Sequence, residues 1–205
     1  MNHRAPDKRG GFSLLEVLIV IAIASTVVLV ASNLSSNVSL LNGLITQQLQ
    51  SRSNTDQLLQ VVTANIQSAE PSAAGAYPID TASTNTFAFY AVIGGGSAVH
   101  IRYFLASSSI YEGVTAPTGS PAVYETSTME VVTDLVNDVT TTTSTPLFTY
   151  YDTSYTGTQS PLSSTTDLSA IRLVGISFYI TAATSSSITP QYYSTLADIR
   201  ELRSN

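Results

Sequence analysis

The chain opens with a short polar, basic stretch that leads into a long apolar run. Residues 1–11 read MNHRAPDKRGG and residues 12–31 read FSLLEVLIVIAIASTVVLVA, in which Glu16 is the only charged residue. A helix of this length, at about 1.5 Å per residue, spans roughly the 30 Å of a bilayer's hydrocarbon core. The bases Arg4, Lys8 and Arg9 precede the run, so we expect the leader in the cytoplasm and the remainder outside.

Apolar residues continue at helical spacing beyond this run. Within residues 34–49 and 58–69 they recur at steps of three and four, at Leu34, Val38, Leu41, Ile45, Leu49, Leu58, Val62, Ile66 and Ala69. This amphipathic period predicts one helix over residues 12–69, and Pro71 predicts its end. The pattern breaks at residues 51–55 and lacks flanking charge pairs, which favours packing on a sheet over a coiled coil. Gly43 lies inside the helix and could be tolerated there or mark a bend.

From Thr86 the pattern changes to β-branched and aromatic runs separated by Gly, Pro, Ser and Thr. These runs predict strands at residues 86–93, 98–105, 121–125, 129–133, 147–151, 170–181 and 194–202. Residues 94–96 (GGG) indicate a hairpin connection. Residues 130–139 could form either a short helix or a strand, because their periodicity does not decide between the two. The Ser/Thr-rich stretches 139–145, 153–166 and 183–189 read as exposed loops. A long helix followed by antiparallel strands predicts an α+β fold.

Composition removes several classes of function. The 205 residues include no cysteine, which excludes disulfides, zinc–thiolate sites, iron–sulfur clusters and a cysteine nucleophile. Removing residues 1–11 takes away three of the eight bases and one of the fourteen acids, leaving a net charge of −8. A body this acidic repels a phosphate backbone unless its arginines cluster, so nucleic-acid binding is not expected.

Two ordinary interpretations of the N-terminal segment leave features unexplained. A secretory signal peptide cut near residues 22–24 (AIA) would be cut in the middle of the apolar run, which continues to Ala31. A plain membrane anchor explains the length and the flanking bases, but neither residues 10–11 (GG) nor Glu16. A carboxylate within an apolar helix is expensive, and such residues usually mark a function and a partner.

Residues 9–16, RGGFSLLE, resemble the processing signal of type IV prepilins and type II secretion pseudopilins. The resemblance implies that a membrane-embedded prepilin peptidase cuts between Gly11 and Phe12 and then methylates the new Phe12 amine. It also implies that Glu16 pairs with the N-terminal amine of a neighbouring subunit during assembly. In a dry filament core this carboxylate would be strongly penalised unless a cation were paired with it.

The resemblance also implies an organisation, a set of partners and a location. It divides the chain into a leader (residues 1–11), a transmembrane and filament-core helix (12–33), an amphipathic helix on the head (34–70) and a β-rich head (71–205). The implied partners are prepilin peptidase, other pilin or pseudopilin subunits and the inner-membrane assembly platform. The subunit would cross the cytoplasmic membrane once, head outside, and then join a cell-surface or periplasmic filament.

The head narrows the resemblance further. The order of its segments is similar to that of W-type minor pilins and J-type minor pseudopilins. These segments are residues 148–152 (FTYYD), a long loop, residues 171–180 (IRLVGISFYI) and a final strand ending at residues 199–203 (IRELR). The absence of cysteine departs from many Gram-negative major pilins. We therefore expect a structural, non-enzymatic minor subunit without a cofactor.

Two other functions remain open from the sequence. One is a membrane-anchored extracytoplasmic binding or enzymatic domain. The other is a competence pseudopilin for DNA uptake, which would require Arg102, Arg172, Arg200 and Arg203 to form one exposed patch.

Candidate catalytic and metal-binding residues in the head are few. His100 is the only histidine after Gly11, and its alternation with Val99 and Ile101 predicts a surface or inter-element position rather than a catalytic one. Asp134 and Asp138 lie four residues apart near Asn137, but the spacing is not that of an EF-hand, and no metal site is predicted. The tyrosines are expected to pack on the sheet by default, although they could form a ligand surface: Tyr103, Tyr111, Tyr124, Tyr150, Tyr151, Tyr179, Tyr192 and Tyr193.

Overall fold

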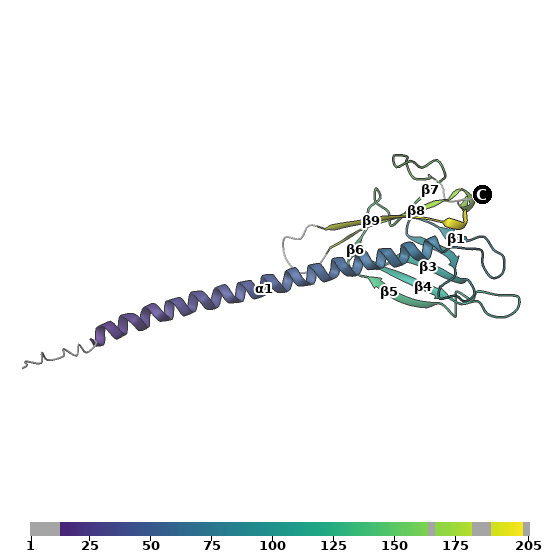
Figure 1. Cartoon of the computed structure of the whole chain (residues 1–205). Coiled ribbons are helices and arrows are strands. Elements are labelled where there is room, and N and C mark those ends of the chain that lie inside the picture. Colours follow the sequence, from purple (N-terminus) through teal and green to yellow (C-terminus); the bar gives the residue numbers. More distant parts are fainter. Residues whose placement is uncertain (1–12, 164–166, 182–189, 203–205) are drawn as a thin grey trace, which may run out of the picture. The chain divides into compact units, whose positions relative to one another are not determined.

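The computed structural model describes residues 13–163, 167–181 and 190–202. It contains one long helix, α1 (Leu14–Gln67), followed by nine β-strands and two short 3-10 helices, η1 (Leu168–Ala170) and η2 (Arg200–Leu202) (Figure 1). The chain divides into two compact units, residues 1–53 and residues 54–205. The α+β arrangement expected from the sequence is confirmed.

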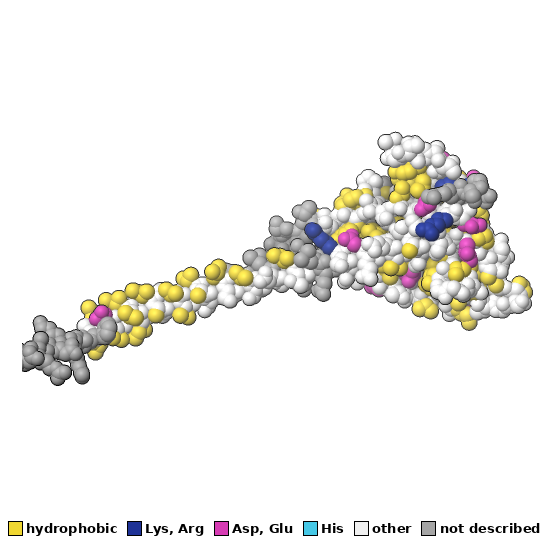
Figure 2. Space-filling model, in the orientation of Figure 1, with side chains coloured by type: hydrophobic (Ala, Val, Ile, Leu, Met, Phe, Trp, Pro, Cys, Tyr) yellow, Lys and Arg dark blue, Asp and Glu magenta, His cyan; other side chains and the backbone are white. Residues whose placement is uncertain are grey.

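The first unit is the apolar part of α1. The segment Leu14–Ser36 has a mean hydropathy of 2.8 and buries none of its surface, so it is long and apolar enough to cross a membrane. Some of its hydroxyls bond to the backbone of the helix itself: Ser25 and Thr26 each donate to the Ala22 carbonyl at 2.9 Å. Side chains that bond to their own backbone in this way cost little in a medium without water. Figure 2 shows apolar side chains covering this segment.

The second unit contains a five-stranded antiparallel sheet in simple sequence order. Its strands are β1 (Ile79–Ala82), β2 (Thr86–Ala91), β3 (Val99–Ala106), β4 (Ser109–Thr115) and β5 (Val131–Val136). The predicted glycine hairpin joins β2 to β3, with Gly94 and Gly95 at φ values of 70° and 80°. The β3–β4 hairpin has a two-residue loop, Ser107 and Ser108, also at positive φ (48° and 64°). Positive φ at both positions matches the right-handed twist of the flanking strands.

The other sheet of this unit is built around β8 (Leu173–Ile180). Its partner on one edge is β9 (Gln191–Asp198), whereas β6 (Val139–Thr140) and β7 (Phe148–Tyr151) pair with successive parts of the opposite edge. All of these pairings are antiparallel. Side chains of β7, β8 and β9 therefore alternate between an inner face, toward the core, and an outer face.

The last turns of α1 pack against both sheets. Leu59, Val62 and Ile66 are buried together with residues of both sheets, and Figure 1 shows the last turns of the helix ribbon alongside strands of both. The ring of Phe87 on β2 lies 5.9 Å from Phe148 on β7, so the sheets share one core. The core residues with at most 1% exposure are Ile66, Phe87, Ala88, Phe89, Ala91, Ile101, Tyr103, Leu147, Ile171, Val174, Phe178, Ala197 and Ile199. For this part of α1, the expected packing on a sheet is confirmed.

The helix ends at Gln67, two residues before the predicted end. Ala69 forms a bridge with Ala91 of β2, and the Glu70 N–H donates to the Tyr90 carbonyl at 2.9 Å. Residues 69 and 70 therefore bond to strand β2 instead of continuing the helix, and the helix ends before Pro71.

Several strand predictions are wrong or incomplete. Residues 121–125 form no strand, because Val123 makes only an isolated bridge to Thr118. This segment instead crosses the outer face of the first sheet, where the Tyr124 hydroxyl donates to the Ala98 carbonyl at 2.7 Å. Strand β5 begins two residues after the predicted start, β9 begins three residues earlier than predicted, and β1, β4 and β6 were not predicted. Residues 130–139, left undecided by periodicity, contain β5 and the first residue of β6.

Candidate functional site

The N-terminal end of α1 carries the residues that the sequence singles out. Gly11 and Phe12 lie outside the described residues, and the description begins at Ser13. The Ser13 carbonyl accepts the N–H groups of Glu16 (3.0 Å) and Val17 (3.2 Å), which places Glu16 in the first helical turn. A carboxylate is favoured there, because the unpaired N–H groups of a helix N-terminus carry partial positive charge.

Glu16 is surrounded by exposed apolar side chains. Leu14 and Leu15 are 81% and 69% exposed, and Val17 is 47% exposed. Glu16 is also exposed and is the only charged residue within Leu14–Ser36. If this surface packs against other apolar helices, the carboxylate will lose water and will require a cation to compensate.

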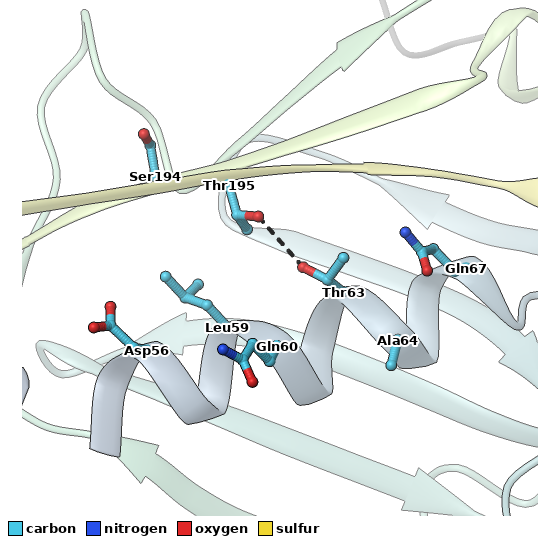
Figure 3. Close-up of a pocket in the computed structure, with 8 residues that line it drawn as sticks. All are labelled: Asp56, Leu59, Gln60, Thr63, Ala64, Gln67, Ser194 and Thr195. Atoms are coloured by element: carbon cyan, nitrogen blue, oxygen red, sulfur yellow. Dashed lines mark hydrogen bonds between the residues drawn. The ribbon is translucent and has the colours of Figure 1, made fainter. Parts of the chain in front are cut away.

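A groove runs along the last turns of α1, beside strand β9 (Figure 3). It has a volume of about 450 Å³ and is lined by Asp56, Leu59, Gln60, Thr63, Ala64 and Gln67 from the helix, and by Ser194 and Thr195 from β9. The Thr63 and Thr195 hydroxyls lie 3.4 Å apart across it, and Arg200 Nη2 donates to Gln67 Oε1 at 3.0 Å. These contacts tie the helix to β9 and to η2, and among the described residues that line the groove only Asp56 is charged.

His100 is buried, which corrects the expectation of a surface residue but agrees with an inter-element position. Only 4% of it is exposed, and its Nε2 lies 3.2 Å from Oδ2 of Asp80 on β1. Its ring contacts Tyr90, with centroids 5.1 Å apart, and Tyr124, at 6.5 Å. The described contacts of His100 are thus with an acid and two aromatic rings, which is a packing arrangement rather than a nucleophile–base pair. Asp80 was missed because its segment reads as a loop between Pro78 and the first predicted strand.

Three of the four arginines that a DNA-binding patch would require have structural partners. Arg102 donates from Nε to Glu130 Oε1 at 2.8 Å and lies over the Phe104 ring at 4.0 Å. The hydrogen bond to Glu130 raises the pKa of the Arg102 guanidinium. Arg172 Nη1 donates to the Ile171 carbonyl at 3.0 Å and also to the Ser169 carbonyl. Arg200 binds Gln67, as described above, and Arg203 lies outside the described residues.

The acids near Asn137 do not form a cation site. Asp134 pairs with Tyr111 across β4 and β5, and Asp138 adopts a positive φ of 59° where β5 gives way to β6. The Asn137 side chain accepts a hydrogen bond from the Ser109 hydroxyl at 2.6 Å. Within the three described ranges, no three Asp, Glu or His side chains gather closely enough to hold a metal ion.

Comparison with known families identifies the N-terminal segment. The model of the prokaryotic N-terminal methylation motif matches residues 6–32, which include Gly11, Phe12, Glu16 and the whole apolar run of residues 12–31. No curated protein sequence matches the chain. The motif implies processing by prepilin peptidase and assembly with other pilins, and the apolar helix fits anchoring by a single membrane pass. The resemblance seen in residues 9–16 is therefore confirmed: this chain carries the N-terminal methylation motif characteristic of type IV pilins and pseudopilins.

Proposed function

We propose that the chain is a structural, non-enzymatic subunit of a type IV pilus or a type II secretion-like filament. The observation that carries this proposal is the methylation motif at residues 6–32, which runs into a helix with a fully exposed apolar surface. Such a surface is stable only in a bilayer or against other apolar helices. A filament subunit uses both environments in turn.

Processing and assembly are linked through one charge pair. Prepilin peptidase cuts between Gly11 and Phe12, and the new Phe12 amine is methylated. The amine is the cation that compensates Glu16 of a neighbouring subunit when their helices pack. Because an unpaired buried charge costs several kcal/mol, the pair selects the correct axial register between subunits.

Before assembly, the subunit crosses the cytoplasmic membrane once, with the basic leader in the cytoplasm and the head outside. Glu16, in the first helical turn, then lies near the cytoplasmic interface, where its carboxylate can reach water at tolerable cost. The inner-membrane assembly platform moves it from this position into the filament.

A minor subunit that primes or caps the filament fits the head better than a major subunit. The chain lacks the cysteine pair of many major pilins. The head has the order β7, a long loop, β8 and β9, and the resemblance to W-type minor pilins and J-type minor pseudopilins rests on the sequence of these segments.

Two measurements test the proposal. Mass spectrometry of the exported chain should give an N-terminus at Phe12 carrying one added methyl group. In the native host, Glu16→Gln should leave this processing intact but reduce incorporation into sheared filaments at least tenfold, which corresponds to about 1.4 kcal/mol.

The control for the second measurement is Glu201→Gln, the same chemical change at an exposed position of the head. It should be incorporated normally. Normal incorporation of Glu16→Gln would remove the assembly role of Glu16, and a mature N-terminus anywhere other than Phe12 would remove the processing role of Gly11 and Phe12.

A further inference from the structure

A second groove, larger than the one beside α1, lies on the outer face of the second sheet. It has a volume of about 630 Å³, within the range of small-molecule sites. Its floor is formed by outward side chains of β7, β8 and β9, and its walls by residues 144–146 and by Tyr155 and Pro161. We call it the tyrosine groove and define it by Thr149, Tyr151, Tyr155, Ser177, Tyr192, Ser194 and Leu196.

Gly175 shapes the floor of the tyrosine groove. It pairs with Thr149 on β7 and with Leu196 on β9, so it lies in the middle of the three strands. A Cβ at this position would collide with the Thr149 hydroxyl and would lie 3.4 Å from the Tyr151 ring. The glycine therefore allows the Tyr151 side chain to lie across the strand, with Tyr155 packed against it at 4.2 Å between ring centroids.

One wall is fixed by hydrogen bonds from the loop to itself and to β8. The Ser177 hydroxyl donates to the Pro146 carbonyl at 2.9 Å. Thr142 and Thr145 exchange backbone hydrogen bonds of 3.1 Å, and their hydroxyls lie 2.6 Å apart.

The opposite wall is also held in place by its own side chains. Asp152 Oδ1 accepts from the Ser154 hydroxyl at 2.6 Å and from the Ser154 N–H at 2.9 Å, and these two bonds lower the pKa of the Asp152 carboxyl. Gln159 Nε2 donates to the Ser154 carbonyl at 2.9 Å, and its Oε1 accepts from the Thr156 N–H at 2.7 Å. Because both walls are already ordered, a ligand would lose little affinity to ordering them.

The lining offers aromatic rings and hydroxyls but no charge. Tyr192 is 48% exposed and is supported from the side by Tyr179, with ring centroids 5.0 Å apart. Within the described part of the chain, no hydrogen bond engages the hydroxyls of Tyr151, Tyr155, Tyr192, Thr149 or Ser194. None of the described residues that line the groove is Asp, Glu, Lys, Arg or His.

We propose that the tyrosine groove binds a neutral oligosaccharide. A pyranose ring presents an apolar C–H face that stacks on tyrosine, and a rim of hydroxyls that both donate and accept hydrogen bonds. The groove alternates ring faces with hydroxyls in the same way. An anionic glycan or a phosphate would find no cation there, and desolvating its charge would be costly. A proline-rich peptide also stacks on tyrosine, but its prolines lack N–H donors, so it would satisfy the groove's hydroxyls less completely.

This inference rests on the second unit alone and not on filament assembly. The two proposals can therefore fail separately. Glu16→Gln should reduce incorporation into filaments at least tenfold while leaving oligosaccharide binding unchanged.

The test uses the purified full chain in a zwitterionic detergent without a sugar headgroup. Isothermal titration is carried out with neutral hexasaccharides of glucose, xylose, mannose and N-acetylglucosamine. At least one should bind, and Tyr192→Ala should weaken that binding at least tenfold, or about 1.4 kcal/mol. Tyr111→Ala, a matched change on β4 of the other sheet, should alter the affinity less than about twofold.

A second variant, which fills the groove, distinguishes loss of the binding site from loss of the fold. Ser194→Trp places a large ring at an exposed floor position without removing a core residue, so it should abolish binding while the far-ultraviolet circular dichroism and the midpoint of urea unfolding stay those of the unmodified chain. The proposal is overturned if none of the hexasaccharides binds. It is also overturned if polygalacturonate or a proline-rich decapeptide binds more tightly, or if Tyr192→Ala and Ser194→Trp both bind like the unmodified chain.

Discussion

The buried hydroxyl of Tyr103 connects three elements of the head. It donates to Glu112 Oε1 on β4 at 2.7 Å and accepts from Asn65 Nδ2 on α1 at 2.9 Å. Tyr103 itself is only 1% exposed. Burial, followed by the hydrogen bond to Glu112, raises the pKa of the Tyr103 phenol far above its ordinary value. The polar contact between the helix and the first sheet therefore depends on a phenol that stays protonated.

This arrangement makes the head sensitive to alkali. The folded state retains the Tyr103 proton above pH 10, whereas the unfolded chain releases it near its ordinary pKa of about 10. Stability is therefore complete below about pH 10 and falls above it, by about 1.4 kcal/mol per pH unit for this group. In urea unfolding followed by circular dichroism, Tyr103→Phe should cost about 1–3 kcal/mol at pH 7, because Asn65 and Glu112 lose their partner.

The same variant should reduce the loss of stability between pH 10 and pH 11 by up to about 1.4 kcal/mol. The remaining loss includes Tyr150, whose phenol is also buried and has a raised pKa. The control is Tyr111→Phe, a partly exposed tyrosine stacked on Phe104, which should leave the slope unchanged. An unchanged slope for Tyr103→Phe would contradict the assigned pKa shift.

Side-chain contacts of this kind could not be predicted from the sequence. The pattern correctly placed Tyr103 in a strand and predicted that it packs on the sheet. Its partners, however, come from a helix and a strand that only the tertiary fold brings together. His100 shows the same limit, because alternation along β3 could not reveal that residues 121–125 and Asp80 cover its face of the sheet.

At the scale of elements, docking of the helix on the head is set by its period. Leu59, Val62 and Ile66 recur at steps of three and four and are buried to 9% exposure or less. Val61, one residue before Val62, faces away and is 50% exposed. The helix therefore presents one narrow apolar face to the two sheets.

Substitutions on the buried and on the exposed face of α1 should change the free energy of unfolding by different amounts. Ile66→Ala creates a cavity at a fully buried position and should cost about 2–5 kcal/mol, measured by urea unfolding of the full chain in detergent. Val61→Ala should change stability by less than about 0.5 kcal/mol, because its side chain already faces solvent. Equal costs for the two variants would show that the helix is not docked through this face.

The elements that the sequence revealed are those with strong periodicity. The helix and most of the longer strands were predicted with bounds shifted by only a few residues. Strand β4 was missed because its hairpin uses Ser107 and Ser108 at positive φ instead of the Asn-Gly or Asp-Gly that usually signal such a turn. The wrong strand at residues 121–125 has the composition of a strand, but Tyr124 anchors it across the sheet.

At the scale of the whole molecule, the apolar content of 43% divides between two different uses. In residues 1–53, the span Leu14–Ser36 buries nothing within the chain. In residues 54–205, the apolar residues form one core shared by α1 and both sheets. The sequence revealed the first use directly, since a nearly unbroken apolar run of this length is typical of a membrane-spanning helix. It could not show which turns of the helix belong to the head.

The boundary of the independently folding head should therefore lie inside the helix. A fragment of residues 54–205 keeps Leu59, Val62 and Ile66, and should unfold cooperatively and be soluble without detergent. A fragment of residues 71–205 loses all three side chains, each contributing about 1.5–3 kcal/mol of burial. That sum is comparable to the whole stability of an ordinary domain, about 5–15 kcal/mol, so the shorter fragment should lack a cooperative transition in urea and should bind a hydrophobic dye. If residues 71–205 instead fold cooperatively by themselves, the last turns of α1 are an accessory to the head rather than part of its core.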